Sequence, residues 1–253
     1  MSANSLKVLV IALNLVFPLF SIAQDADAGV EEVYKGLAKL LSGDIDGAIE
    51  GYDRAIEINP ALANAYVNRG AARQIKDDMD AALADYNQAL VLSPDYADAY
   101  QARGSLSYVK RNWDEALKDY KRSCELSEKD RDYTHIFIWL IQTRQGETET
   151  AHKELADYLE KQRNSEQETW ATKIAGYLLG RISEAELLAA AKSTNDPTEQ
   201  GQLCELWYYA GMKKLLAGSK AGAGVYFRKC LATKIKIFVE YQFAEAELKA
   251  LGQ

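Results

Sequence analysis

A period of 34 residues constrains this chain more strongly than any other feature. Glycine recurs at Gly36, Gly70 and Gly104, and each glycine is followed 12 residues later by an alanine and 16 residues later by a tyrosine. One unit of this length cannot bury its own apolar face, so such units stack into a continuous array of helices. The sequence therefore predicts an all-α helical-repeat solenoid built from antiparallel helix pairs.

The residue types of the repeat have physical roles within such a pair. Glycine inside a helix costs roughly 1 kcal/mol relative to alanine, so its recurrence at Gly70 indicates close packing. Tyr86 supplies bulk between helices. Asp77 and Asp78 are expected in the turn between the two helices, where an aspartate can cap the second helix, and Pro94 is expected after that helix ends.

The series Tyr66, Gly70, Ala82, Tyr86 and Pro94 resembles the tetratricopeptide repeat (TPR). This resemblance implies a right-handed superhelix that binds other proteins and catalyses no reaction. It divides the chain into three TPR repeats at 29–62, 63–96 and 97–130, a degenerate repeat at 131–164, a helical connector at 165–203, a TPR repeat at 204–237 and a capping helix at 238–253. Within the connector, Ser165 with Glu168 and Ser183 with Glu186 have the spacing of capping boxes.

The first 23 residues have the pattern of a secretory signal peptide. Lys7 precedes an apolar run from Val8 to Phe20, and Ser21-Ile22-Ala23 follows as a small-x-small cleavage site. We expect cleavage after Ala23, with 24–28 as a short N-terminal segment, a secreted or periplasmic location and no membrane insertion after cleavage. The alternative is an uncleaved membrane anchor, although the run is shorter than the roughly 20 residues of a spanning helix.

The charge of the chain argues against two classes of partner. The formal net charge is −7, and removal of Lys7 with the signal peptide makes it −8. An acidic array has no electrostatic reason to bind nucleic acid or an anionic membrane surface. Other proteins are therefore the expected partners.

The C-terminal half supports a second, narrower resemblance. The segments ISEAELLAAA, CELWYYAGMKKLLAG, YFRKCLAT and FVEYQFAEAELK are similar to the tail of bacterial envelope TPR proteins of the NlpI lipoprotein kind. That resemblance implies a non-enzymatic adaptor that brings envelope hydrolases and proteases together. No cysteine directly follows the apolar run, so the lipid anchor of that family is not implied here.

The TPR resemblance also implies a binding surface, the concave face formed by the first helix of each repeat. Its mixture of polar and apolar residues suits a helix or an extended peptide, and it lacks the basic residues with which the chaperone-tail class of TPR clamps a carboxylate. The alternative is that these residues pack only against other parts of the chain. The predicted binding residues are Tyr34, Leu37, Asn64, Val67, Asn68, Ala71, Ile75, Asp98, Gln101, Ser105 and Tyr108.

Two arginines and two aspartates are also related by the repeat. Arg69 precedes Asp85 by 16 residues, and Arg103 precedes Asp119 by the same interval. We expect each arginine to pair with its aspartate across two helices. As surface pairs they would contribute about 0–1 kcal/mol each.

The cysteines and histidines carry little chemistry in the sequence. Cys204 is expected to open the first helix of the last repeat and Cys230 to lie late in its second, where they form either a disulfide or two buried packing residues. A nucleophile–base pair of Cys124 and His135 lacks a third group, and His152 belongs to no cluster, so no metal, cofactor or enzymatic activity is expected.

Three functional hypotheses follow from the sequence. The first is an exported adaptor or scaffold that binds a peptide or helix in its groove. The second is a structural subunit of an envelope assembly that self-associates, for example as a homodimer. The third, a thiol-dependent enzyme acting through Cys124, has the least support from the residues.

Overall fold

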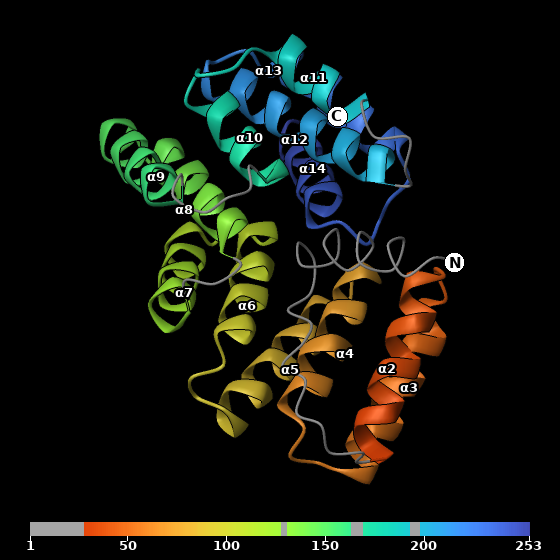
Figure 1. The fold of residues 1–253 in the computed structure, drawn as a ribbon. Helices are drawn as coiled ribbons and strands as arrows, with labels where there is room; N and C mark the ends of the chain where they lie inside the picture. Colours follow the sequence, from red (N-terminus) through yellow and green to blue (C-terminus); the bar gives the residue numbers. More distant parts are fainter. Residues whose placement is uncertain (1–27, 128–130, 163–168, 193–197) are drawn as a thin grey trace. The chain divides into compact units, whose positions relative to one another are not determined.

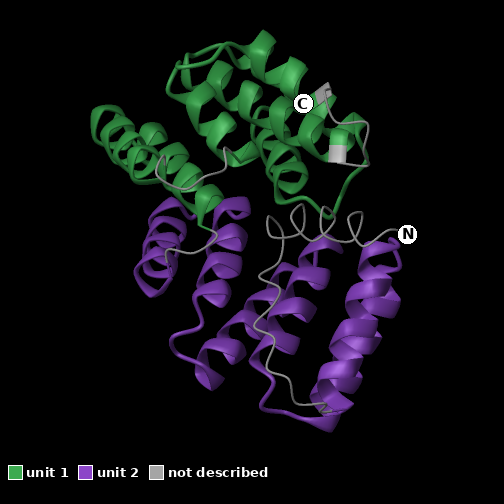
Figure 2. Cartoon of the chain, in the orientation of Figure 1, with its two compact units in different colours: residues 1–12, 129–253 green, residues 13–128 purple. Residues whose placement is uncertain are grey.

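The computed structural model describes residues 28–127, 131–162, 169–192 and 198–253, and these contain thirteen α-helices and no strand (Figure 1). The predicted all-α class is confirmed. The chain divides into two compact units, unit 2 with residues 13–128 and unit 1 with residues 1–12 and 129–253 (Figure 2). The predicted signal peptide and Ala23 lie outside the described residues, and no described helix is long and apolar enough to span a bilayer.

Unit 2 consists of three helix pairs that stack in chain order. Each second helix packs against its own first helix, α3 and α5 also pack against the first helix of the next pair, and the first helices contact one another in sequence. The pairs follow the three ranges predicted as TPR repeats, except that the first helix begins one residue before its range, at Ala28. They are α2 (Ala28–Leu41) with α3 (Ile45–Ile58), α4 (Ala63–Ile75) with α5 (Met79–Leu92), and α6 (Ala97–Val109) with α7 (Trp113–Leu126).

The repeated glycine in each pair lies directly under the aromatic ring of the second helix. A Cβ atom on Gly70 would lie 2.7 Å from Cε1 of Tyr86, a distance that real Cβ atoms do not tolerate. The ring is in turn fully buried, with a relative exposure of 1%. The same close approach recurs at Gly36 with Tyr52 (2.7 Å), at Gly104 with Tyr120 (3.0 Å) and, in unit 1, at Gly211 with Phe227 (2.6 Å).

The turn inside each pair contains one residue with a positive φ. In the second pair this residue is Asp77, at 67°, and the next N–H, that of Asp78, donates to the carbonyl of Arg73 at 2.9 Å. This is the hydrogen bond that closes a helix C-terminus. Asp78 also accepts from the N–H of Ala81 at 3.3 Å, so the predicted cap is confirmed. The corresponding residues in other pairs are Gly43, Arg111, Gly146 and Gly218.

A ladder of ion pairs and hydrogen bonds, centred on arginines of the first helices, joins helices within and between the repeats of unit 2. Arg69 donates to both carboxylate oxygens of Asp85, at 3.1 and 2.6 Å, and to Asp53 of the preceding repeat at 2.7 Å. Arg103 likewise donates to Asp119 at 2.7 and 2.8 Å, and to the side chain of Asn87 at 2.9 Å. Both predicted pairs are therefore confirmed.

These pairs are not the surface pairs that the sequence suggested. Asp85 and Asp119 are only 3% and 5% exposed because the helices on either side enclose them. Burial opposes the charge on Arg69, yet its hydrogen bonds to Asp85 and Asp53 outweigh that cost and raise the pKa of the guanidinium. Each arginine thus fixes the angle between neighbouring repeats through charge-assisted, partly bidentate bonds.

The first repeat departs from this ladder for a local reason. Gly51 stands where the later repeats have Asp85 and Asp119, and a Cβ at Gly51 would lie 2.8 Å from the Cα of Gly36. With no carboxylate at that position, the lysine before Gly36 pairs within its own helix instead: Lys35 donates to Glu32 at 2.7 Å. Glu32, which replaces a repeat tyrosine, also accepts from Arg54 at 2.8 Å.

Unit 1 is built around α12, which packs against α8, α10, α11, α13 and α14. The apolar run from Ile136 to Ile141 in α8 is buried throughout, as its sequence predicted. The predicted capping box is confirmed, since the Ser183 N–H donates to Glu186 at 2.7 Å and the Glu186 N–H donates to the Ser183 hydroxyl at 3.2 Å. The predicted box of Ser165 and Glu168 lies outside the described residues. The helices are α8 (Asp132–Arg144), α9 (Thr148–Gln162), α10 (Trp170–Leu178), α11 (Glu184–Lys192), α12 (Thr198–Leu216), α13 (Lys220–Ala232) and α14 (Val239–Ala250).

Two features of unit 1 differ from the sequence expectation. Helix α12 begins at Thr198, so Cys204 lies inside the helix and does not open it. Helix α14 does more than cover the last pair, because it also reaches back to α8. Phe243 meets Phe137 edge to face at 5.3 Å, and Arg144 donates to the buried Glu247 at 2.5 Å.

We expect Gly70→Ala to destabilise the protein even though alanine is the better helix former. The new methyl group would displace the ring of Tyr86, and overpacking of this kind costs about 1–3 kcal/mol. Gly176→Ala is the matched control, since its Cβ would meet only Ile182, at 3.9 Å. Thermal melts should show a lower Tm for Gly70→Ala alone; equal Tm changes in both variants would contradict the packing argument.

We also expect Arg69→Met to lower the free energy of unfolding by about 2 kcal/mol, because it leaves the buried carboxylate of Asp85 with Arg73 as its remaining arginine. Arg122→Met removes exposed pairs with Asp95 and Glu125 and should cost about 0.5 kcal/mol or less. Urea denaturation of both variants tests this difference. Similar losses in the two variants would show that burial of the carboxylate has no special weight.

Candidate protein-binding surface

The eleven predicted binding residues lie on the first helices of unit 2, and we call the side of α2, α4 and α6 that carries them the first-helix face. On α4, Asn64, Asn68, Ala71 and Ile75 are spaced by three or four residues and so follow one side of the helix. On α6, Asp98, Gln101, Ser105 and Tyr108 have the same type of spacing. The structure thus brings the predicted residues of each helix onto one face.

Burial divides these eleven residues into two groups. Tyr34 is 40% exposed, and four more are partly exposed: Asn64, Ile75, Asp98 and Ser105. The other six are buried, namely Leu37, Val67, Asn68, Ala71, Gln101 and Tyr108. Only the first group offers surface that a partner could contact without a rearrangement of side chains.

Two of the buried residues have a clear packing role. Val67 has no exposed surface and belongs to a core cluster with Ala82, Tyr86 and Leu106, which joins the second and third repeats. Tyr108 is 1% exposed and packs edge to face against Trp113, with 5.0 Å between ring centroids. Their prediction as binding residues is untested, but substitutions there would disturb the core as well as any ligand contact.

Asn68 differs from the other buried residues because it retains unused hydrogen-bonding capacity. Its side chain is 2% exposed, and its Nδ2 donor has no hydrogen-bond partner. An unpaired buried donor costs free energy that a ligand acceptor can recover. A backbone carbonyl of a bound peptide is an acceptor of suitable chemistry for this donor.

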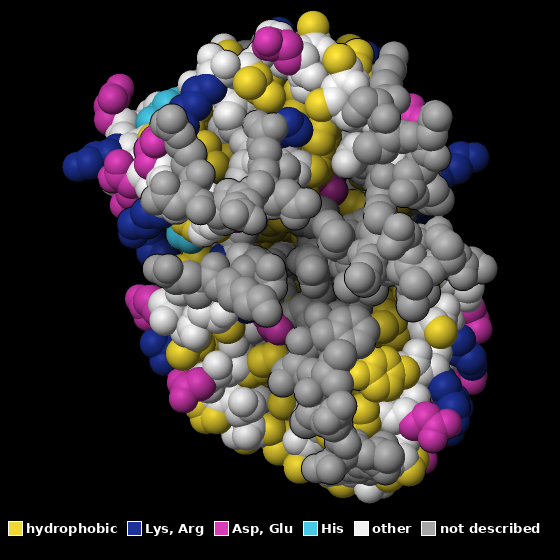
Figure 3. All heavy atoms as spheres, in the orientation of Figure 1, with side chains coloured by type: hydrophobic (Ala, Val, Ile, Leu, Met, Phe, Trp, Pro, Cys, Tyr) yellow, Lys and Arg dark blue, Asp and Glu magenta, His cyan; other side chains and the backbone are white. Residues whose placement is uncertain are grey.

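The arginines of α4 are engaged in the ion-pair ladder. Arg69 and Arg73 both donate to Asp85, and Arg103 of α6 donates to Asp119. The described surface in the view of Figure 3 shows hydrophobic side chains towards the middle of unit 2, with Asp, Glu, Lys and Arg towards the margins. A carboxylate clamp would need basic residues at positions that include Val67, Ala71 and Asp98, and none of these three residues carries a positive charge.

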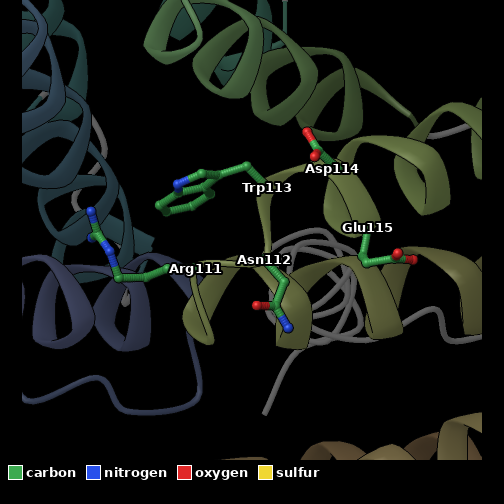
Figure 4. Close-up of a pocket in the computed structure, with 5 residues that line it drawn as sticks. All are labelled: Arg111, Asn112, Trp113, Asp114 and Glu115. Carbon is green, nitrogen blue, oxygen red and sulfur yellow. The ribbon is translucent and has the colours of Figure 1, made fainter.

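A shallow pocket lies at the turn between α6 and α7. It has a volume of about 330 Å³ and is lined by Arg111, Asn112, Trp113, Asp114 and Glu115 (Figure 4). The Arg111 guanidinium lies 4.9 Å from the centroid of the Trp113 ring, a cation–π contact. Five consecutive residues, from the turn and the first residues of α7, line this pocket, so it is a local surface feature with no convergent set of reactive groups.

The sequence's candidate thiol–imidazole pair gains no support from the local surroundings of either residue. Cys124 is partly buried in α7. His135 stacks on Tyr158 with 3.8 Å between ring centroids, and His152 Nδ1 lies 2.8 Å from the carbonyl oxygen of Thr148. Within the described residues, no three His, Cys, Asp or Glu side chains are grouped to hold a metal ion.

The sequence analysis missed a buried acidic cluster in the core of unit 1. Glu205 on α12 is 1% exposed and accepts from the Tyr133 hydroxyl at 2.7 Å and from the Trp170 indole N–H at 2.8 Å. Glu240 on α14 is fully buried and accepts from the Tyr209 hydroxyl at 2.8 Å. The available signal was an acid inside an otherwise apolar segment, as in CELWYY and FVEYQF.

Burial controls the ionisation of both acids. It raises the pKa of Glu205 well above the ordinary value, and the nearby charge of Glu240 adds to this effect. Burial also raises the pKa of Glu240 to about 7, although the hydrogen bond from Tyr209 lowers it in part. The second oxygen of Glu240, Oε2, has no hydrogen-bond partner, which is consistent with a neutral carboxyl group at acidic pH.

Two family models match the N-terminal half of the chain. A model of the TPR repeat matches residues 36–74, and a model of the tetratricopeptide repeat matches residues 63–96. Both matches lie in unit 2, over the helix pairs described above. The chain therefore contains TPR repeats, as the 34-residue pattern predicted.

Solved structures show the same architecture over most of the chain. A tetratricopeptide repeat protein from Parabacteroides merdae has a TM-score of 0.53 and 18% identity, over 89% of this chain and 86% of that one. PilW, a type IV pilus biogenesis factor, has a TM-score of 0.53 and 15% identity, over 82% of this chain and 94% of that one. The fold is thus that of a TPR helical-repeat protein.

A shorter match covers about half of the chain. The first TPR of Spaghetti (RPAP3), bound to an HSP90 peptide, is 25% identical over 48% of this chain and 98% of that one, with a TM-score of 0.46.

We expect the free energy of unfolding to fall as the pH rises from about 4.5 to about 7, because of Glu240. The unfolded carboxyl loses its proton near its ordinary pKa of 4.5, whereas the folded carboxyl keeps it until about 7. Within that window, each pH unit favours the unfolded state by about 1.4 kcal/mol. Glu240→Gln removes this titration, so the variant should gain stability relative to the wild type as the pH rises.

Thermal melts at intervals of one pH unit measure this effect. Glu245→Gln is the matched control, since Glu245 is exposed on the same helix. Its pH dependence should equal that of the wild type. Parallel curves for Glu240→Gln and the wild type would show that Glu240 does not titrate in the folded protein.

Proposed function

We propose that this chain is an exported TPR adaptor that binds a peptide or a helix of a partner protein on the first-helix face of unit 2. The observation that carries the proposal is the regular stacking of α2, α4 and α6, each held by a buried glycine–aromatic contact. Such stacking keeps side chains of successive repeats at fixed spacing. A rigid, periodic surface of this kind suits an elongated ligand with periodic side chains.

The chemistry of the face favours a ligand that presents backbone carbonyls and apolar side chains. Tyr34 and Ile75 supply accessible apolar surface, whereas Asn64 and Ser105 supply neutral polar groups. Asn68 adds a buried donor without a partner. Because Arg69 is bound to Asp85 and Asp53, a terminal carboxylate has no comparable cation to pair with on α4.

Export and an envelope role form the finer part of the proposal. The apolar run from Val8 to Phe20 and the cleavage motif ending at Ala23 support export through a signal peptide. The similarity of the C-terminal half to NlpI-like envelope proteins supports the recruitment of envelope hydrolases or proteases as partners. The intact mass of the chain recovered after bacterial expression tests export: a chain beginning at Gln24 is expected, and a full-length chain would contradict cleavage.

Binding is tested with two matched double variants. Tyr34→Glu with Ile75→Glu places charge on the first-helix face, while Ile58→Glu with Val91→Glu places the same charge on exposed positions of the second helices α3 and α5. Proteins that the wild type captures from envelope extract identify the partner, and the segment of the partner that binds is then located. A synthetic peptide of that segment is then titrated against all three proteins by fluorescence anisotropy.

We expect the first-helix variant to bind at least tenfold more weakly, a loss of about 1.4 kcal/mol, and the second-helix variant to bind within about twofold of the wild type. Circular dichroism is used to check that both variants remain folded. Loss of binding in the second-helix variant alone would place the site on the opposite side of the pairs. If the chain captures a second copy of itself, and its mass in light scattering rises with concentration, the result would instead favour the self-associating envelope subunit.

A further inference from the structure

Two cysteine sulfurs are in direct contact in the core of unit 1. Cys204 on α12 and Cys230 on α13 are both fully buried, and their Sγ atoms lie 3.2 Å apart as free thiols. The two helices are joined by the short turn at Gly218, and both cysteines lie towards the ends remote from that turn. A disulfide holds its two sulfurs about 2.05 Å apart, so sulfurs that already lie 3.2 Å apart need to approach by only about 1 Å to form the bond.

The surroundings of the pair exclude the solvent that exchange chemistry requires. The Cys230 thiol has one further polar contact, with the carbonyl oxygen of Glu240 at 3.7 Å. Burial raises the pKa of the Cys230 thiol well above its ordinary value, and its contact with Cys204 acts in the same direction. The thiolate is the reactive form, so the folded dithiol should react slowly with external disulfides.

We propose that Cys204 and Cys230 are joined as a structural disulfide while the chain folds, before the core of unit 1 closes over them. The oxidant is a disulfide, either a thiol–disulfide oxidoreductase or a small-molecule disulfide, of the kind present in compartments that receive exported proteins. The inference concerns the core of unit 1 and does not depend on what the first-helix face binds.

The exchange proceeds in two balanced steps. The thiolate of one cysteine attacks a sulfur of the donor disulfide, which forms a mixed disulfide and releases one donor thiolate. The thiolate of the second cysteine then attacks the cysteine sulfur of that mixed disulfide, which forms the Cys204–Cys230 bond and releases the second donor thiolate. The two donor thiolates take up the two protons that the cysteines lost, so the reduced donor, which is a dithiol or two separate thiols, carries both electrons.

The bond would stabilise unit 1 by restricting the unfolded chain. The two cysteines are 26 residues apart, and closing a loop of this length removes conformational freedom from the unfolded state. For a chain of this size, a typical disulfide raises Tm by about 5–10 °C. Since α12 contacts most of the other helices of unit 1, the bond fixes α13 to the centre of that unit.

The test counts thiols after refolding. The full chain is unfolded with reductant, refolded in a buffer of oxidised and reduced glutathione, denatured again and labelled with maleimide. We expect one label, on Cys124, and a non-reducing peptide map in which Cys204 and Cys230 are linked. Three labels on protein that had refolded, or a bond that includes Cys124, would overturn the proposal. Both measurements use the wild-type chain, so neither requires a variant to fold.

Variants provide a second measurement. The Tm of the wild type and of Cys124→Ala should fall by about 5–10 °C when reductant is added, whereas Cys204→Ala with Cys230→Ala should be insensitive to it. The matched control uses the one cysteine outside the pair, in α7 of unit 2. Equal sensitivity to reductant in all three proteins would contradict a stabilising bond between Cys204 and Cys230.

Discussion

The contact between a helix glycine and the aromatic ring of its partner helix sets the geometry on which the remainder of this structure depends. With no Cβ at Gly70, one edge of the Tyr86 ring lies against the first helix, and the two helices approach closely. Alanines at Ala82 and Ala89, both without exposed surface, allow the same approach along the second helix. The repeat therefore tolerates a glycine in a helix interior because close packing stabilises the pair by more than the helix propensity that it loses.

Charge then determines how one pair sits against the next. In unit 2 the bonds from Arg69 to Asp85 and Asp53 reach across two repeats, and the bonds from Arg103 to Asp119 and Asn87 repeat that arrangement. The arginines of α4 and α6 are thus engaged in structural bonds, and the accessible part of the first-helix face consists of apolar, neutral polar and acidic side chains. On the same helices, the arginines thus have a structural role, whereas other side chains form the proposed binding face.

Unit 1 keeps the glycine–aromatic contact at Gly211 and Phe227 but organises its core differently. Glu205 and Glu240 bring buried carboxyl groups to α12 and α14, where tyrosine and tryptophan side chains donate to one oxygen of each. Cys204 directly precedes Glu205 in the chain, and the thiol of Cys230, which contacts Cys204, also contacts the backbone carbonyl oxygen of Glu240. With this buried polar core, the stability of unit 1 is expected to depend on pH and, through the proposed disulfide, on oxidation, whereas unit 2 relies on packing and on ion pairs.

The sequence by itself determined the helix pairs, their period, the pairing of Arg69 with Asp85 and the cap at Asp78, because each depends on residues at a fixed spacing along one or two adjacent helices. Tertiary structure decided the rest. Burial of Val67, the inward position of Glu240 and the return of α14 to α8 all depend on side chains that are distant in the chain. Sequence periodicity shows which side of a helix is apolar, but burial at a given position is set by the neighbouring helix that covers it.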